Sequence, residues 1–229
     1  MPTTPHLADD LHALERLLSS MINLVDEQLA DATNALLYPN PTRSRTVAEN
    51  DKQVDRMELE LNRCCEDLLE THAPSNDALR LVLAALRINT DLERIGDQCR
   101  NLAYTAPHLD ASAPERLSSL VQMADLSRAM LHQAHQALQQ HDRLLARKVI
   151  ARDLQVNRIC SSTIDDLAAS DSLSPTDAET LVHLLTATKA LERIADHIKN
   201  IASHVIFCIE GTNARRSRVA ATRAGEAAS

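Results

Sequence analysis

The segment DLERIGDQCRNLA, from Asp91 to Ala103, returns later in the chain as ALERIADHIKNIA, from Ala190 to Ala202. Earlier segments repeat as well: MINLVDEQLADATNAL, which begins at Met21, aligns with MADLSRAMLHQAHQAL, which begins at Met123. The pattern indicates two copies of one structural unit. Seven of the thirteen positions in the first pair of segments are identical: Leu92/Leu191, Glu93/Glu192, Arg94/Arg193, Ile95/Ile194, Asp97/Asp196, Asn101/Asn200 and Ala103/Ala202.

Each copy is predicted to form three helices. Glycine occurs only three times in 229 residues and aromatic residues are equally scarce, which argues against a sheet with its turns. Long helices must bury their apolar stripes against each other, which predicts an all-α fold of two antiparallel three-helix bundles in tandem, related by a pseudo-two-fold axis. The first repeat is expected at 6–106 and the second at 114–211. The expected helices are His6–Leu37, Arg45–Thr71, Ser75–Tyr104, Pro114–Gln140, Asp142–Ala169 and Ser174–Glu210.

Composition also restricts the class of protein. The formal net charge is −8 with both signs interspersed, so no nucleic-acid partner is expected. Residues 212–229 are basic and are expected to form a disordered tail. Five cysteines without a CxxC spacing indicate buried free thiols in a reducing compartment. There is no signal-peptide pattern and no apolar run long enough for a bilayer, so a soluble cytoplasmic protein is predicted.

Polar residues one helical turn apart recur in both copies and are candidate metal ligands. Carboxylate oxygens at this spacing suit one hard cation or bridge two, but two carboxylates alone leave the coordination shell incomplete. A continuous polar stripe is expected in each copy, formed by Glu93, Asp97 and Asn101 in the first and by Glu192, Asp196 and Asn200 in the second.

The second helix of each copy is the expected donor of the missing ligands. DKQVDRM, from Asp51, aligns with DLQVNRI, from Asp153, and the acids again lie one turn apart. Asp51 and Asp55 serve the first copy and Asp153 the second, where Asn157 replaces the acid that Asp55 keeps. The second site is therefore expected to be poorer in negative charge.

Acids at this spacing are also commonly solvated and paired with neighbouring cations. Asp97 has Arg94 and Arg100 within reach along its helix, and Asp196 has Arg193 and Lys199. Two further residue sets are weaker candidates. His197 follows Asp196 but aligns with Gln98, and the i, i+4 spacing of Glu179 and His183 is more typical of an ordinary surface pair.

The two segments LERIGDQCRNLA and LERIADHIKNIA resemble the duplicated E(D)xxxD signature of the PhoU family, as do HLADDLHAL near the start and NIASHVIFCIEG near the end. The resemblance extends from Leu7 to Gly211. It implies a negative regulator of the phosphate-starvation response that modulates high-affinity phosphate uptake. The implied partners are the ATPase of the phosphate ABC transporter (PstB-like) and a phosphate-sensing histidine kinase (PhoR-like). It also implies a homodimer, in the cytoplasm or held peripherally at the inner face of the membrane by its partners.

The resemblance further implies multinuclear metal clusters, one per repeat, for which iron, manganese and zinc all remain open. By residue match, the ligands would be Glu93, Asp97, Asn101, Glu192, Asp196 and Asn200, with Asp51, Asp55 and Asp153 completing the shells.

Other functions were weighed against this one. A catalytic di-metal bundle usually requires Glu-x-x-His, and no Glu in this chain has His three residues later. The sequence also lacks a glycine-rich phosphate loop, so an enzyme is not predicted. A metal-free helical adaptor and a paralogue serving a different phosphate transporter both remain open.

Overall fold

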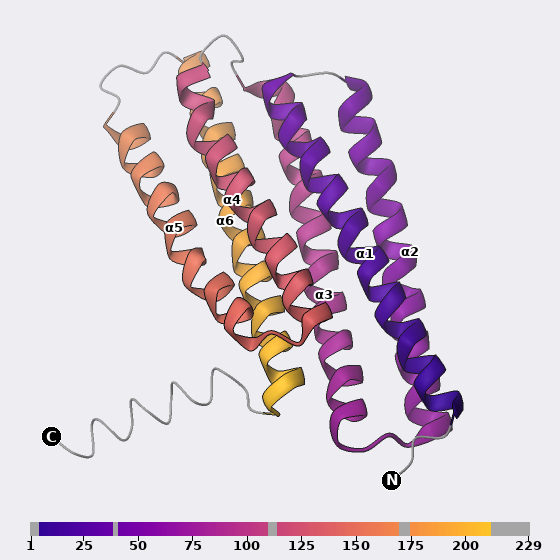
Figure 1. Ribbon diagram of the computed structural model, residues 1–229. Helices are drawn as coiled ribbons and strands as arrows, with labels where there is room; N and C mark the ends of the chain where they lie inside the picture. Colours follow the sequence, from indigo (N-terminus) through magenta and orange to yellow (C-terminus); the bar gives the residue numbers. More distant parts are fainter. Residues whose placement is uncertain (1–4, 39–40, 110–113, 170–174, 212–229) are drawn as a thin grey trace, which may run out of the picture.

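The described residues form six long helices arranged as two antiparallel three-helix bundles, as the computed structural model shows (Figure 1). The structure describes residues 5–38, 41–109, 114–169 and 175–211. The helices are α1 (Pro5–Leu37), α2 (Pro41–His72), α3 (Asn76–Thr105), α4 (Pro114–Gln140), α5 (Arg143–Ala168) and α6 (Pro175–Glu210), with a 3₁₀ turn η1 (Ala106–His108) after α3. The predicted fold class is confirmed.

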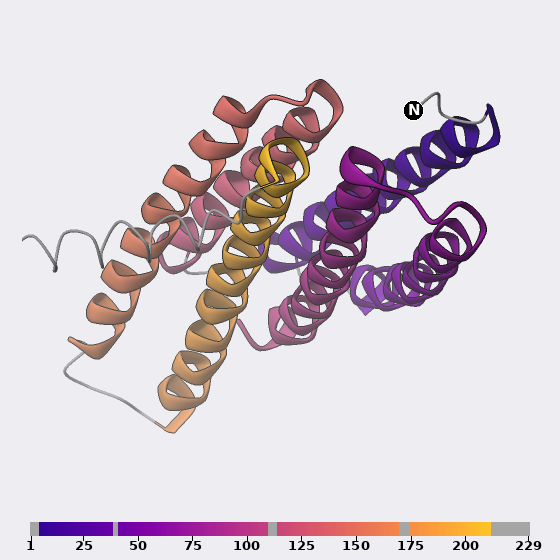
Figure 2. The ribbon, with the colours of Figure 1, turned by 90° about the horizontal axis from the view of Figure 1, so that it is seen from below.

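The two bundles are packed into one body with a continuous apolar core. Among the described helices, α3 and α6 share the most extensive contact although they belong to different repeats, and α1 also contacts α4. The view from below shows the bundles side by side (Figure 2). Fully buried residues such as Leu18 and Ile95 in the first repeat and Leu120 and Ile194 in the second belong to the same core. Each long helix therefore buries its apolar stripe on its own bundle and, for α3 and α6, on the other bundle too.

Aligned residues of the two repeats meet between the bundles, which is the signature of a pseudo-two-fold axis. Asp26 of α1 and Arg128 of α4 occupy the same position in the two copies. The Arg128 Nε and Nη2 atoms lie 3.1 and 3.0 Å from the two Asp26 carboxylate oxygens. Equivalent residues can touch each other only where they approach the axis that relates the copies.

Other predictions have mixed outcomes. The helix α2 begins at Pro41, earlier than the expected Arg45, because proline is tolerated in the first turn of a helix. All five cysteines are free thiols, but only Cys65, Cys99 and Cys160 are buried as predicted, whereas Cys64 and Cys208 are half-buried. Residues 212–229, expected to be a disordered tail, lie outside the described residues. No described helix is long and apolar enough to cross a membrane.

Candidate functional site

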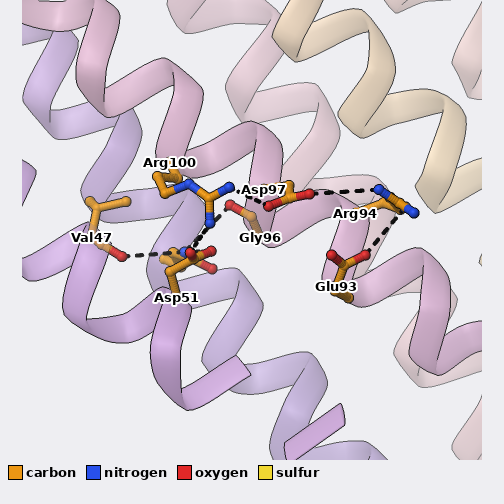
Figure 3. Close-up of polar contacts among 8 residues, drawn as sticks. Val47, Asp51, Glu93, Arg94, Gly96, Asp97 and Arg100 are labelled. Atoms are coloured by element: carbon orange, nitrogen blue, oxygen red, sulfur yellow. Dashed lines mark hydrogen bonds and ion pairs between the residues drawn. The ribbon is translucent and has the colours of Figure 1, made fainter. Parts of the chain in front are cut away.

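Each bundle contains a buried aspartate that is held by a cation from the neighbouring helix. In the first bundle, Arg100 of α3 bridges Asp51 of α2 and Asp97 of its own helix, and its Nη2 lies 2.6 Å from Asp97 Oδ1 (Figure 3). Asp51 is only 5% exposed. A carboxylate buried to this degree is stable as an anion only when it is paired and hydrogen-bonded. The ion pair therefore joins α2 to α3.

The second bundle repeats this arrangement at the equivalent positions. Lys199 of α6 contacts Asp196 of its own helix, and its Nζ lies 2.9 Å from Asp153 Oδ2 of α5. Asn157 donates a further hydrogen bond, from its Nδ2 to the same Asp153 oxygen at 3.1 Å. Two of the predicted metal ligands, Asp51 and Asp153, are thus engaged in ion pairs between helices.

A buried glutamine distinguishes the first bundle from the second. Gln28 of α1 is fully buried. Its Nε2 atom lies 3.4 Å from the Asp51 carboxylate and from the carbonyl oxygens of Val47 and Gly96. A Cβ atom built on Gly96 would come within 3.1 Å of the Gln28 Oε1 atom. The absence of a side chain at Gly96 therefore leaves the space that the Gln28 side chain occupies.

The second bundle lacks this donor, because the residues aligned with Gln28 and Gly96 are Met130 and Ala195. Among the described residues, the buried Asp153 Oδ1 atom has no hydrogen-bond partner. The sequence pattern of candidate ligands does not include Gln28. The available signal was the joint change of glutamine to methionine and glycine to alanine between copies, but only the structure shows that these positions touch.

Two further carboxylates of the first repeat, Asp97 and Glu58, act on Glu93. Glu93 and Asp97 lie one turn apart on α3, and Arg94 contacts both, at 3.3 Å from Glu93 and 3.8 Å from Asp97. The pKa of Glu93 is raised, mainly by burial and then by the negative charges of Asp97 and Glu58. Glu58 is the acid of α2 that acts on Glu93, whereas the predicted ligand Asp55 is exposed. The negative charges of Glu58 and Asp97 thus gather around Glu93, although among the described residues the oxygens of these three acids do not all lie within 4.8 Å of one another. The three acids are called the first-repeat carboxylate cluster below.

The corresponding surface of the second repeat carries fewer carboxylates. Cys160 aligns with Glu58, and its pKa is raised by burial and then by the charge of Glu192. Lys189 Nζ lies 2.6 Å from Glu192 Oε2, and Asp196 is already paired with Lys199. This donor set of two paired carboxylates and a thiol suits a hard, oxygen-seeking cation less well than the three acids of the first repeat.

The third residue of each predicted polar stripe lies toward the contact between the bundles. Asn101 lines an open cavity between α3 and α6, while Asn200 Nδ2 lies 3.4 Å from Asp91 Oδ1 across the contact between the bundles. Each i to i+4 step turns about 40° around an α-helix, so two steps turn about 80°. Asn101 and Asn200 are therefore turned around their helices, away from Glu93 and Glu192 and toward the α3–α6 contact.

His197 takes part in a polar contact between the bundles. Its Nδ1 atom lies 2.8 Å from Asp91 Oδ1 of α3, and His204 Nε2 lies 3.3 Å from Asp91 Oδ2. Burial acts to raise the pKa of Asp91, but the hydrogen bonds from His197 and His204 outweigh it and lower that pKa. The weak candidate ligand His197 is thus directed toward the other repeat, as part of the α3–α6 contact.

A model of the PhoU domain matches residues 18–106 and 120–205. The chain belongs to the PhoU family. A phosphate-specific transport system accessory protein PhoU homolog from Pseudomonas aeruginosa is 29% identical over 218 residues, covering 93% of this chain and 90% of that protein. The protein PhoU of Escherichia coli K12 is 26% identical over 212 residues, covering 90% of this chain and 86% of the relative.

Solved PhoU structures share the fold over nearly their whole length. The crystal structure of PhoU from Pseudomonas aeruginosa has a TM-score of 0.80 at 29% identity, and covers 90% of this chain and 99% of that one. The phosphate transport system regulatory protein PhoU from Streptococcus pneumoniae has a TM-score of 0.82 at 25% identity, with 90% and 98% covered. Both repeats therefore have counterparts in solved members of the family.

Proposed function

We propose that this protein is an accessory regulator of phosphate uptake that acts through contacts with other proteins and not through catalysis. The observation that carries the proposal is the match across both repeats to proteins named for the phosphate-specific transport system. In this role it damps the phosphate-starvation response when phosphate is plentiful. Its proposed partners are the ATPase of the phosphate ABC transporter and the phosphate-sensing histidine kinase. It acts as a homodimer in the cytoplasm or held at the inner face of the membrane by these partners.

The decisive experiment is deletion of the gene with complementation. Expression of phosphate-starvation genes in phosphate-rich medium is expected to rise in the deletion strain and to return to its basal level when the chain is restored. Binding of the purified chain to the purified ATPase and to the kinase cytoplasmic domain then tests the two contacts. An unchanged starvation response in the deletion strain would refute the proposal. A changed phosphate uptake with an unchanged starvation response would instead favour a paralogue serving another phosphate transporter.

We further propose that the first repeat holds a metal ion or cluster at Glu58, Glu93 and Asp97. Three carboxylates that include a destabilised anion form a donor set of hard oxygens, and a cation would relieve their repulsion. Arg94 partly neutralises this cluster and would have to turn away, which its exposed side chain allows. A bound metal would brace α2 against α3. A cluster in the second repeat, at Glu192 and Asp196, fits less well because lysines pair with both acids.

Metal analysis of protein purified without a chelator or affinity tag tests this proposal. Wild type is compared with Glu93→Gln/Asp97→Asn and with the matched second-repeat variant Glu192→Gln/Asp196→Asn. The content of bound iron, manganese or zinc should fall by at least one equivalent in the first variant and should fall by less in the second. Absence of metal from the wild type, with both variants folded by circular dichroism, would refute the metal site and favour the metal-free adaptor.

A further inference from the structure

Two histidines and a glutamate from different repeats meet beside the cavity between the bundles. His108 ends the turn η1 that follows α3, while Glu179 and His183 lie one turn apart near the start of α6. The two imidazole rings are stacked, with centroids 4.3 Å apart and an angle of 10° between the planes. One possible ligand atom of each residue lies within 4.8 Å of those of the other two. The packing of α3 on α6 creates this cluster from residues far apart in the sequence.

We propose that His108, Glu179 and His183 bind one divalent transition-metal ion of the Zn²⁺ type. Imidazole nitrogen and carboxylate oxygen are the donors that zinc accepts, and two histidines with one acid leave the fourth position to a water or another oxygen ligand. Magnesium and calcium require mainly oxygen donors. This donor set therefore differs from the first-repeat carboxylate cluster, and the two sites select different ions.

The geometry of the cluster is within reach of a tetrahedral site. Zinc bonds of about 2.0–2.1 Å place neighbouring donor atoms roughly 3.4 Å apart, so the present separations of up to 4.8 Å must shorten by about 1.4 Å at most. His108 and Glu179 are exposed and His183 is only half-buried. Because the two imidazole rings are stacked, at least one ring must also turn about its side-chain bonds before both nitrogens face one ion, and the exposure of His108 leaves room for that rotation. The i, i+4 spacing of Glu179 and His183 holds two of the three donors on one face of α6.

The proposed site draws its donors from both repeats, so a bound ion would affect how the two bundles are held together. His108 belongs to the end of the first repeat, and the other two donors belong to the second. Both histidines also line the cavity of about 660 Å³ between α3 and α6, so the fourth position opens toward it. A bound ion would cross-link the two bundles at the end of the α3–α6 contact that lies beyond the Asp91–His197 ion pair. It would stabilise one relative placement of the repeats.

The test is titration of the full-length, metal-free chain with Co²⁺, followed by displacement with Zn²⁺. The parent chain for this test carries Glu93→Gln, Asp97→Asn, Glu192→Gln and Asp196→Asn, so that the carboxylate sites do not contribute to metal binding. One equivalent of Co²⁺ should produce the strong visible absorption of a four-coordinate ion, and Zn²⁺ should abolish it. His108→Ala, His183→Ala and Glu179→Gln should each weaken binding by more than about 100-fold. His12→Ala, an exposed histidine on α1, should change nothing.

Thermal unfolding provides a second readout that does not depend on the visible absorption of Co²⁺. Zinc at about 100 times its Kd should raise the Tm by about 5–10 °C in the parent chain and leave the His183→Ala variant unchanged. The proposal is overturned if no visible absorption appears, or if the parent and the His183→Ala variant bind Co²⁺ with equal affinity. Because the substituted side chains are not part of the core, unchanged circular dichroism is expected for every variant.

Discussion

Gly96→Ala, made with and without Gln28→Met, measures the coupling free energy between the glycine and the buried glutamine that packs against it. Alanine in place of a helical glycine stabilises by about 1 kcal/mol when the space around it is open. Here the new Cβ atom would lie 3.1 Å from Gln28 Oε1 and 3.4 Å from Val54 Cγ1. Gln28 cannot retreat without lengthening its contact to Asp51, so overpacking is expected to cost about 1–3 kcal/mol. The single variant should lose about 0–2 kcal/mol of unfolding free energy.

Gln28→Met introduces the residue of the second bundle, where Met130 and Ala195 occupy the positions aligned with Gln28 and Gly96. This substitution removes the crowding but leaves Asp51 Oδ1 without its donor, a loss of about 1–3 kcal/mol. In the double variant the overpacking is relieved and the helical gain of alanine returns, so the two changes should couple favourably by the overpacking cost of about 1–3 kcal/mol. Urea unfolding followed by circular dichroism measures the four proteins of the cycle.

Ala195→Gly is the matched control, because no glutamine packs over that position. It should lose about 1 kcal/mol from helix propensity alone. Additivity of Gly96→Ala and Gln28→Met to within about 0.5 kcal/mol would refute the idea that these two residues determine each other.

Substitutions at three further positions test other features of the structure. Arg100→Met should lower the unfolding free energy by about 3–5 kcal/mol, because it leaves Asp51 buried without its cation. Arg100→Lys should lose much less, since Lys199 makes both contacts in the second bundle, and equal losses in urea unfolding would contradict this. The pKa of Asp91 is lowered, so its stabilising contribution is complete above the unfolded value of 3.8 and is lost as pH falls through the lower folded value. Urea midpoints of Asp91→Asn should therefore be lower than those of wild type at neutral pH and converge with them in acid; a constant difference would count against this. Ala73 has a φ of 41°, in the left-handed region, so Ala73→Gly should stabilise by about 1 kcal/mol and raise the Tm by about 2–4 °C; no rise would show that the turn is not strained.

The architecture was predictable because the repeat and the apolar periodicity are local properties. The scarcity of glycine indicated helices, and prolines lie at the connections between them. The expected start of α4 at Pro114 and the expected end of α6 at Glu210 agree with the structure. The start of α2 was placed too late because Pro41 was treated as a breaker, whereas a proline in the first turn is compatible with a helix. Position in the element, which composition does not reveal, decides how a proline acts.

The polar residues were harder to place. Spacing correctly indicated that Glu93 and Asp97 lie together, because one helical turn separates them. It did not show that Glu58 acts on Glu93, that Asp51 is bound by Arg100, or that Asn200 faces Asp91. Each of these contacts joins two helices, and the rotation of one helix against another is set by packing in the core. A pattern along a single helix carries no information about that rotation.

By itself, the sequence determined that this protein is a duplicated, all-helical unit of the PhoU type, because helix periodicity and repetition are properties of the residue order alone. Only the tertiary structure decided how the two copies meet. The α3–α6 contact brings Asp91 to His197 and His108 to His183, although residues of each pair lie in different repeats. Such neighbours are created when two apolar faces are buried against each other, and that burial is a property of the folded chain as a whole.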